Sequence, residues 1–207
     1  MIHFKKIRWK NFLSTGNAFT EVQLDRTKST LIIGDNGAGK STILDALTFV
    51  LFGKPFRAVN KSQLINSVNQ NGTEVEVEFS IGSKQYLVKR GIKKNFFEIY
   101  QDGKMLNQDA SVRDYQEYLE KTILKLNYKS FTQIVILGSS SFVPFMQLKA
   151  NDRRTIIEDL LDIEIFSVMN QLLKVRVAQN KDDMGTVDIA LGLAKGEVEH
   201  LQFLVEK

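Results

Sequence analysis

The sequence contains no cysteine, and its only two histidines, His3 and His200, stand near opposite ends of the 207 residues. Without cysteine there is no disulfide framework, no thiolate nucleophile and no cysteine-ligated zinc or iron–sulfur site. Two histidines so far apart in the sequence do not suggest a histidine cluster. Any metal is therefore expected to be held by oxygen ligands.

Long hydrophobic runs and processing signals are also missing. No stretch approaches 18 consecutive apolar residues, and the first residues lack a hydrophobic segment followed by a small-residue cleavage site. We therefore expect no membrane partner and a cytoplasmic location. With 43% hydrophobic and 25% charged residues, the composition is that of a globular domain. The net charge of +4 permits contact with nucleic acid without requiring it.

The first third of the chain reads as strands separated by turns. Strands are expected over 2–12, around 22–24 and over 29–33, and the last is a short apolar run typical of a buried strand. After a glycine-rich segment, apolar residues recur at helical spacing over 43–51. Gly53 is expected to end that helix.

The middle of the chain predicts a β-rich lobe. Apolar residues alternate with Glu74, Glu76 and Glu78, which indicates a half-buried strand with its carboxylates in water. Further strands are expected over 85–90 and 96–100. Asp102-Gly103 then predicts a type I′ hairpin turn.

Helical periodicity dominates the rest of the sequence. A helical stripe over 111–126 is followed by strand character over 131–137, a Gly/Ser turn over 138–141, and a helix with Asn151 as its N-cap. A heptad seam follows, with ten apolar side chains in its twelve positions, which predicts a coiled coil that needs a partner helix. The seam consists of Phe166, Asn170, Leu173, Val177, Asn180, Met184, Val187, Leu191, Ala194, Val198, Leu201 and Val205.

The clearest chemical motif is the glycine-rich segment GDNGAGKST over 34–42, which matches G-x-x-x-x-G-K-[ST] between an expected strand and an expected helix. Backbone N–H groups of such a loop surround phosphate oxygens, and the helix N-terminus adds partial positive charge. Lys40 is expected to reach the β- and γ-phosphates of ATP, Ser41 to bind Mg²⁺, and Thr42 to lie on the α-phosphate side. The expected nucleotide-binding residues are Gly34, Asp35, Asn36, Gly37, Ala38, Gly39, Lys40, Ser41 and Thr42.

Only half of an ATPase is visible in the sequence. Hydrolysis also needs a second carboxylate ligand for Mg²⁺ and a group that orients the attacking water. No apolar strand ending in Asp or Asp-Glu follows the loop, and the nearest match, over 156–159, reads as helix. The 207 residues alone are therefore not expected to turn over ATP.

Three features together resemble the SMC-like, ABC-type ATPases of DNA repair, a group that includes bacterial SbcC. They are the phosphate loop, the Asn11-Phe12 pair after a basic strand, and Gln133 before a Gly/Ser turn. Many members carry Arg after the Asn-Phe pair, whereas this chain has Leu13, so that nucleotide contact is not carried over.

Other segments are similar to the T-even phage branch of the same group, whose members are large ATPase subunits of recombination endonucleases. These segments lie over 51–57, 63–67 and 144–162. If the chain is phage-encoded, its cytoplasm is that of the host.

The resemblance implies the N-terminal half of a split ATPase head. In this family a long coiled coil connects the two halves, and two heads sandwich ATP, clamp DNA and control a nuclease. The implied partners are DNA, an SbcD-type nuclease subunit, a second copy of the chain in an ATP-dependent head dimer, and the missing C-terminal half. Gln133 is implied to meet Mg²⁺ and the attacking water. Lys40 and Gln133 are thus the catalytic candidates, and Ser41 and Gln133 the metal ligands.

The expected fold class is α/β. An ABC-type P-loop ATPase head, with a mixed sheet plus antiparallel β-structure, is expected over 1–163, and a coiled-coil helix over 164–207. The expected function is the ATP-binding half of an ATPase subunit that processes DNA double-strand ends. Two alternatives stay open: a nucleotide-binding coiled-coil interaction module without turnover, and the nucleotide-binding domain of a transporter. The transporter alternative requires an LSGGQ motif soon after Gln133, and the sequence has none.

Basic residues cluster in three places, which are candidate DNA contacts or ordinary solvated surface. The clusters are Lys5, Lys6, Arg8 and Lys10; Lys89, Arg90, Lys93 and Lys94; and Lys149, Arg153 and Arg154.

Overall fold

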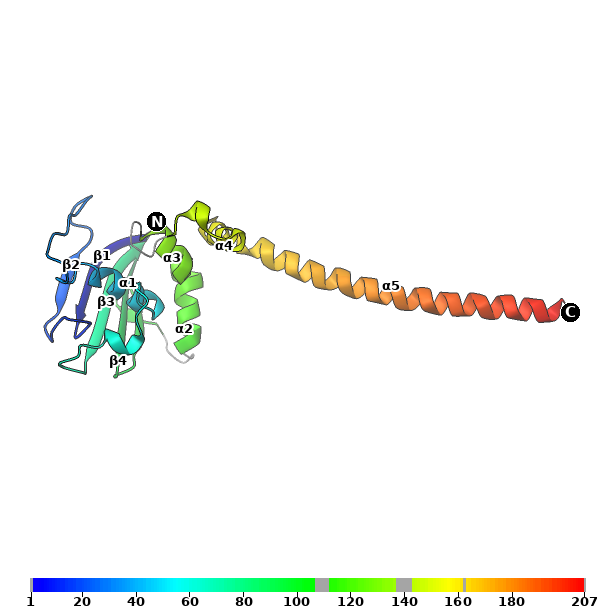
Figure 1. Ribbon diagram of the computed structural model, residues 1–207, viewed down its shortest axis with the longest axis horizontal. Helices are drawn as coiled ribbons and strands as arrows, with labels where there is room; N and C mark the ends of the chain where they lie inside the picture. Colours follow the sequence, from blue (N-terminus) through cyan, green and yellow to red (C-terminus); the bar gives the residue numbers. More distant parts are fainter. Residues whose placement is uncertain (1, 107–111, 137–142, 162, 207) are drawn as a thin grey trace. The chain divides into compact units, whose positions relative to one another are not determined.

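The computed structural model describes residues 2–106, 112–136, 143–161 and 163–206 (Figure 1). Six strands form one sheet in the order β2-β1-β3-β4-β5-β6, and each neighbouring pair is antiparallel. The strands are β1 (Ile2–Lys10), β2 (Thr20–Gln23), β3 (Thr73–Ile81), β4 (Lys84–Ile92), β5 (Phe97–Gln101) and β6 (Lys104–Met105).

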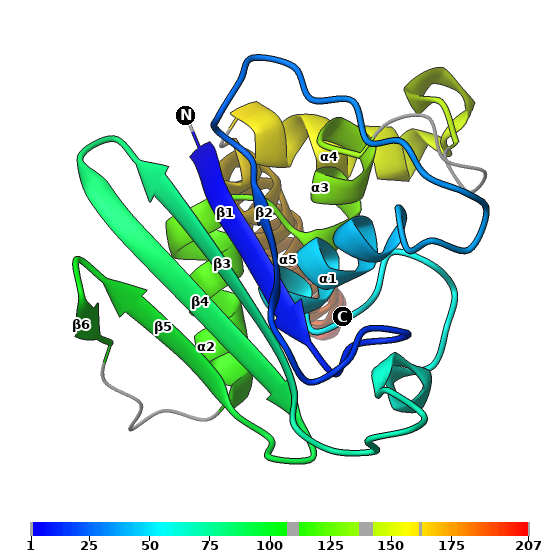
Figure 2. The ribbon, with the colours of Figure 1, turned by 90° about the vertical axis from the view of Figure 1, so that its left-hand side faces the viewer.

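Helices α1, α2 and α3 lie on one face of this sheet (Figure 2). The α-helices are α1 (Thr42–Phe52), α2 (Val112–Tyr118), α3 (Tyr128–Ile134), α4 (Ala150–Leu161) and α5 (Glu164–Val205). A π-helix, η2 (Leu119–Leu124), continues α2, and short 3₁₀ turns are η1 (Lys61–Leu64) and η3 (Phe145–Gln147). The chain divides into two compact units, one ending at Leu160 and the other beginning at Leu161.

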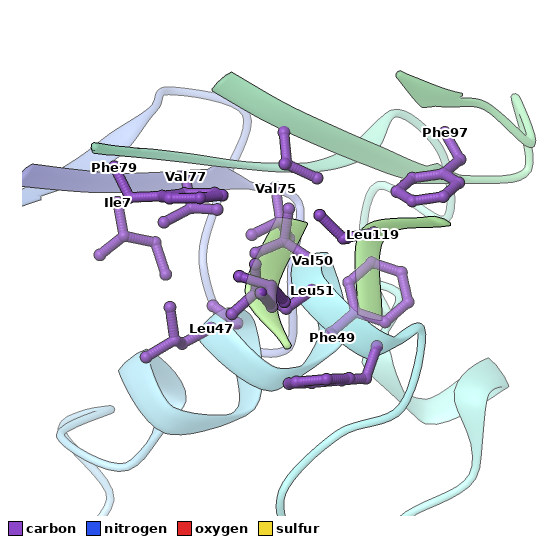
Figure 3. Close-up of a cluster of buried hydrophobic side chains, with 14 of the residues drawn as sticks. Ile7, Leu47, Phe49, Val50, Leu51, Val75, Val77, Phe79, Phe97 and Leu119 are labelled. Atoms are coloured by element: carbon purple, nitrogen blue, oxygen red, sulfur yellow. The ribbon is translucent and has the colours of Figure 1, made fainter. Parts of the chain in front are cut away.

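The core of the first unit lies between the sheet and α1 (Figure 3). Val75, Val77 and Phe79 point from β3 toward α1, as the alternating pattern predicts, and all three are fully buried. Phe12 packs on Phe49 of α1 with 5.6 Å between ring centroids. The aromatic and branched residues of three chain segments thus fix the position of α1 and of the loop that precedes it.

Two turns follow the sequence prediction. Asp102 and Gly103 both have positive φ, 50° and 78°, as a type I′ turn between β5 and β6 requires. Gly53 ends α1 in the left-handed conformation with φ 69°, and its N–H donates to the carbonyl of Phe49. These glycines mark the ends of their elements because other residues adopt such backbone angles at a cost.

The opposite face of the sheet carries a charge ladder, which consists of Lys6, Arg8, Lys10, Glu74, Glu76, Glu78 and Lys89. Arg8 Nη2 lies 2.6 Å and Lys89 Nζ 3.2 Å from the Glu76 carboxylate. The prediction that Glu76 lies in water is wrong, since its side chain is only 3% exposed. The long stems of the flanking cations cover the carboxylate while their charged ends pair with it.

The strand expected over 29–33 is not formed. Leu31 and Ile33 are 82% and 84% exposed, and no strand of the described sheet pairs with them. An extended segment becomes a strand only where a neighbouring strand pairs with its backbone, whatever its β-propensity, and here the exposed backbone is left to water. Between β2 and α1 the chain therefore runs without a strand, and the sheet is antiparallel throughout.

The expected strand over 131–137 is also wrong, because α3 covers most of it. Asn127 is the N-cap of α3, with its side-chain oxygen accepting from the Ser130 N–H at 2.9 Å. This cap and the burial of Phe131 favour helix for a short apolar run that pattern alone leaves ambiguous. The Gly/Ser turn over 138–141 lies outside the described residues.

The last two helices change the predicted N-cap of α4 and confirm the long helix predicted by the heptad seam. α4 begins at Ala150, so Asn151 lies inside its first turn and is not its N-cap. α5 is one continuous helix of 42 residues, as the heptad seam predicts, and it passes through three glycines without a break (Figure 1). No helix in the described ranges has the length and apolarity needed to cross a membrane.

Candidate functional site

The glycine-rich loop leads directly into α1. Gly37 and Gly39 have φ of +88° and +93°, a backbone conformation that glycine adopts without strain. Lys40 Nζ turns back over the loop and donates to the carbonyls of Gly34 and Asp35 at 2.6 and 2.7 Å. The ammonium group is thereby held inside the curve of the loop, where the sequence places the β- and γ-phosphates.

The loop borders a cavity of about 520 Å³. The backbone N–H groups of Gly37, Gly39, Lys40 and Ser41 have no acceptor within the described part of the chain, and all four residues line the cavity. Unpaired N–H groups at a helix N-terminus form an anion-binding nest. The cavity is lined by Leu13, Ser14, Asn36, Gly37, Gly39, Lys40, Ser41, Thr42, Arg57, Gln63, Ile65 and Ser67.

Ser41 is placed to bind a metal ion beside a phosphate group. It is the N-cap residue of α1, but its side chain makes no capping hydrogen bond, so the hydroxyl is free to face the cavity. Such an oxygen suits Mg²⁺, which takes few protein ligands and completes its shell with phosphate oxygens and water. Over the described ranges, no group of three or more histidine and acidic residues forms a separate metal site.

The wall facing the loop is built from two segments joined by asparagines. Asn66 donates its side-chain N–H groups to the carbonyls of Leu13 and Thr15, at 3.1 and 3.0 Å. Asn11, with φ +49°, accepts a side-chain hydrogen bond from Asn69 at 2.6 Å. The Asn11-Phe12 pair thus has a clear structural role, because Asn11 joins the two segments of this wall. These segments contribute Leu13, Ser14, Ile65 and Ser67 to the lining of the cavity.

Arg57 reaches the cavity from the segment that follows α1. Its guanidinium Nε donates to Asp45 Oδ2 at 2.7 Å, and its backbone N–H donates to Asp45 Oδ1 at 2.9 Å. Asp45 lies in the first turn of α1 and is fully buried. The arginine side chain remains 49% exposed, so the cavity contains a second cation beside Lys40.

Gln133 does not line this cavity. It lies on α3, whose residues Tyr128 and Phe131 contact Phe52 at the C-terminal end of α1, opposite the phosphate loop. Its side-chain Oε1 is buried and has no hydrogen-bond partner among the described residues. Of the nine predicted loop residues, six border the cavity, while Gly34, Asp35 and Ala38 do not. Gly34 and Asp35 instead hold Lys40 through their carbonyls, and Gln133 lies apart from all of them.

Sequence reasoning missed the residues of the opposite wall. Leu13, Gln63 and Ile65 have no chemistry that marks them in isolation, and only the fold brings them to the loop. Arg57 had one available signal, because Asp45 interrupts the apolar residues of α1 and a carboxylate in such a position needs a cationic partner.

Most of the basic residues that were candidate DNA contacts have partners within the protein. Lys6, Arg8 and Lys10 are paired in the charge ladder. Arg90 is 8% exposed and donates to the carbonyl of Val50 at 3.0 Å, and burial lowers the pKa of its guanidinium to about 10. Arg153 donates to main-chain carbonyls. These contacts give those residues structural roles.

A family model described as an AAA domain matches residues 6–195. The chain belongs to this AAA domain family. It is 45% identical to exonuclease subunit 2 of Escherichia phage RB69, over 84% of this chain and 31% of that protein. It is also 45% identical to exonuclease subunit 2 of Enterobacteria phage T4, over 86% of this chain and 32% of that protein. The chain therefore spans about a third of the length of these two relatives.

More distant relatives confirm the resemblance to SMC-like DNA-repair ATPases. The DNA double-strand break repair Rad50 ATPase of Thermoplasma acidophilum is 31% identical over 82% of this chain and 19% of that protein. A solved Smc head domain with an extended coiled coil, from Pyrococcus furiosus, matches with a TM-score of 0.57 at 21% identity, covering 91% of this AAA-domain chain and 49% of that one. The expected head fold is confirmed by this likeness.

Proposed function

We propose that this AAA-domain chain is the ATP-binding part of an ATPase subunit in a nuclease complex that acts on DNA ends. The observation that carries the proposal is the cavity at the start of α1, where Lys40 and four unpaired backbone N–H groups converge. This arrangement binds polyphosphate through hydrogen bonds and positive charge. The names of the phage and Rad50 relatives support the nuclease and DNA-repair context.

Each loop residue has a proposed part in binding ATP. The N–H groups of Gly37, Gly39 and Ser41 surround phosphate oxygens. Lys40 gives up its hydrogen bonds to the loop carbonyls and donates to the β- and γ-phosphates instead. Ser41 would hold Mg²⁺ through its hydroxyl oxygen. The chemistry supplied by the ion would be neutralisation of negative charge on the phosphoryl group.

Gln133 remains our proposed second Mg²⁺ ligand and the group that orients the attacking water. Its buried, unpartnered Oε1 supports a role toward a group outside the described residues. Because Gln133 sits on α3, away from the cavity, this role requires α3 to move toward the phosphate loop. We therefore propose that the chain binds ATP without turning it over until other parts of the head are present.

The proposed assembly also involves α5. Seam side chains such as Leu173, Met184 and Leu191 are 60%, 66% and 51% exposed, so the helix presents apolar surface that a partner helix would cover. We propose that α5 pairs in a coiled coil, and that DNA, an SbcD-type nuclease, the other half of the head and a second head are the partners. The same exposure favours the alternative of a nucleotide-binding interaction module, in which α5 pairs with α5 of a second copy.

Calorimetric titration of the chain with ATP and Mg²⁺ tests the proposed binding. Lys40→Ala should weaken binding by roughly a hundredfold or more, because it removes the ammonium group that lies against the loop carbonyls of Gly34 and Asp35. Lys54→Ala, which removes an exposed lysine that does not border the cavity, should bind like the parent chain. Equal affinity of the parent and Lys40→Ala would refute the proposed function.

Light scattering separates the two assemblies. A homodimer that Leu191→Glu converts to monomer supports the interaction module, since a charge in the seam opposes pairing. A chain whose mass is unaffected by Leu191→Glu argues against it.

A further inference from the structure

Asp45 is a buried carboxylate that does not itself border the phosphate-loop cavity. It stands in the first turn of α1, is 0% exposed, and is absent from the residues that border the phosphate-loop cavity. Burial of an ionised carboxylate is costly unless it is paired and hydrogen-bonded. The partner that pairs with Asp45 is Arg57.

Both oxygens of Asp45 are used by Arg57. Oδ1 accepts the Arg57 backbone N–H at 2.9 Å, and Oδ2 accepts Nε at 2.7 Å and lies 2.5 Å from Nη2. The carboxylate thus fixes the backbone and the guanidinium of the same residue. Arg57 Nη1 has no hydrogen-bond partner within the described ranges, and the side chain lines the cavity.

The segment that carries Arg57 is anchored at a second point. Tyr128 donates its hydroxyl to the carbonyl of Pro55 at 2.8 Å, and burial followed by the nearby charge of Asp45 raises the pKa of that phenol. Gly53 turns the chain out of α1 in the left-handed conformation. The segment is therefore held just before the arginine, and Asp45 fixes both the backbone N–H and the guanidinium of Arg57 itself.

We propose that Asp45 is a positioning residue of the phosphate-loop cavity, which holds Arg57 so that its free N–H edge faces the phosphate groups of the ligand. An arginine uses two of its N–H groups on the carboxylate and keeps the others for an anion. Preorganising the side chain in this way removes the rotamer entropy that a free arginine loses on binding. The inference rests on the proposed binding of ATP at this site.

The Asp45→Asn variant distinguishes the positioning of Arg57 by Asp45 from the effect of the Asp45 charge on ATP. A carboxylate near a polyphosphate repels it, so removal of the charge alone would strengthen ATP binding. If Asp45 positions Arg57, Asp45→Asn instead weakens the binding of MgATP roughly tenfold, as measured by calorimetry on the 207-residue chain. Unchanged or tighter binding by this variant would overturn the inference.

A double-variant cycle tests whether Asp45 acts through Arg57. Arg57→Ala should weaken MgATP binding roughly tenfold, and Asp45→Asn combined with Arg57→Ala should bind no more weakly than Arg57→Ala alone. Additive losses would show that Asp45 acts independently of Arg57 and would overturn the proposal. Circular dichroism of each variant shows whether the first unit remains folded.

Rescue of MgATP binding by free guanidinium tests the role of Asp45 directly, because such rescue is not expected if Asp45 only stabilises the fold. Millimolar guanidinium chloride should restore MgATP binding to Arg57→Ala, because the Asp45 carboxylate remains to seat the ion, but not to the double variant. Sodium chloride at the same concentration should restore neither. Failure of guanidinium to rescue Arg57→Ala counts against the proposal, and this test stands even if Asp45→Asn does not fold.

The Lys40→Ala variant distinguishes the two levels of inference. If Lys40→Ala binds MgATP like the parent, the site is not a nucleotide site and the proposed function fails. If Lys40→Ala abolishes binding while Asp45→Asn leaves it unchanged, only the role of Asp45 is refuted.

Discussion

Replacing Glu76 by Gln measures what the charge ladder contributes to the fold. The Glu76 side chain is 3% exposed, while those of Arg8 and Lys89 are 33% and 24% exposed. Removing one partner of a fully buried pair costs about 3–5 kcal/mol, whereas an exposed pair is worth up to about 1 kcal/mol. Because the carboxylate is buried but both cations reach water, we expect Glu76→Gln to lower the free energy of unfolding by about 2 kcal/mol at pH 7.

The penalty should depend on pH in a defined direction. Burial by itself raises the pKa of Glu76, but hydrogen bonds from Arg8 and Lys89 outweigh it and leave the pKa below its ordinary value. A carboxyl with a lowered pKa stabilises the folded state above its unfolded pKa and loses that contribution as the pH falls through the folded pKa. The difference between parent and Glu76→Gln should therefore be complete at pH 7 and shrink below about pH 4.

Urea unfolding provides the assay, with the fluorescence of Trp9 as the probe. Trp9 is the single tryptophan, lies in β1 and is 3% exposed. The matched control is Glu78→Gln on the same strand, since Glu78 is 38% exposed and pairs with Lys6 at 3.0 Å. The control should cost less than about 0.5 kcal/mol. Equal costs for the two variants, or a Glu76→Gln penalty that persists at pH 3, would refute the reasoning.

Two further predictions concern the loop and the core. Gly37→Ala forces alanine to φ +88°, a backbone conformation that costs a residue with a Cβ about 1–2 kcal/mol even though nothing lies within 4 Å of that atom. MgATP binding should therefore weaken in calorimetry and the urea midpoint should fall slightly, and an unchanged affinity for MgATP would contradict the assigned role of the loop. Phe12→Ala should lower the free energy of unfolding by about 3–5 kcal/mol, because Phe12 is fully buried on Phe49. Phe19→Ala, at a ring 39% exposed, should cost about 1 kcal/mol in the same urea experiment, and similar losses for both would contradict the assigned core.

The parts that local sequence determines could be predicted. The phosphate loop with α1, the strand alternation of β3 and the turn at Asp102-Gly103 each depend on residues adjacent in the chain. In these segments the spacing of apolar residues and the conformational demands on glycine leave few alternatives. The loop half of the candidate site was therefore visible in the sequence.

The parts that depend on distant partners could not be predicted. Burial of Glu76 requires two cations from neighbouring strands, and the contact of Arg57 with Asp45 joins residues on either side of a turn. Leu31 and Ile33 have strong strand character, yet a strand forms only beside another strand. The β-propensity of a segment shows that it can form a strand, but whether it does so depends on a neighbouring strand.

The lengths of the strands have a consequence for the behaviour of the chain in concentrated solution. The sheet ends in its two shortest strands, β2 with four residues and β6 with two, so its edges offer little backbone for aggregation with another molecule. The segment with Leu31 and Ile33 lacks this protection, because it combines exposed strand-forming side chains with unpaired backbone. Intermolecular β-pairing should therefore begin there, and a charged gatekeeper such as Ile33→Lys should keep the chain dispersed.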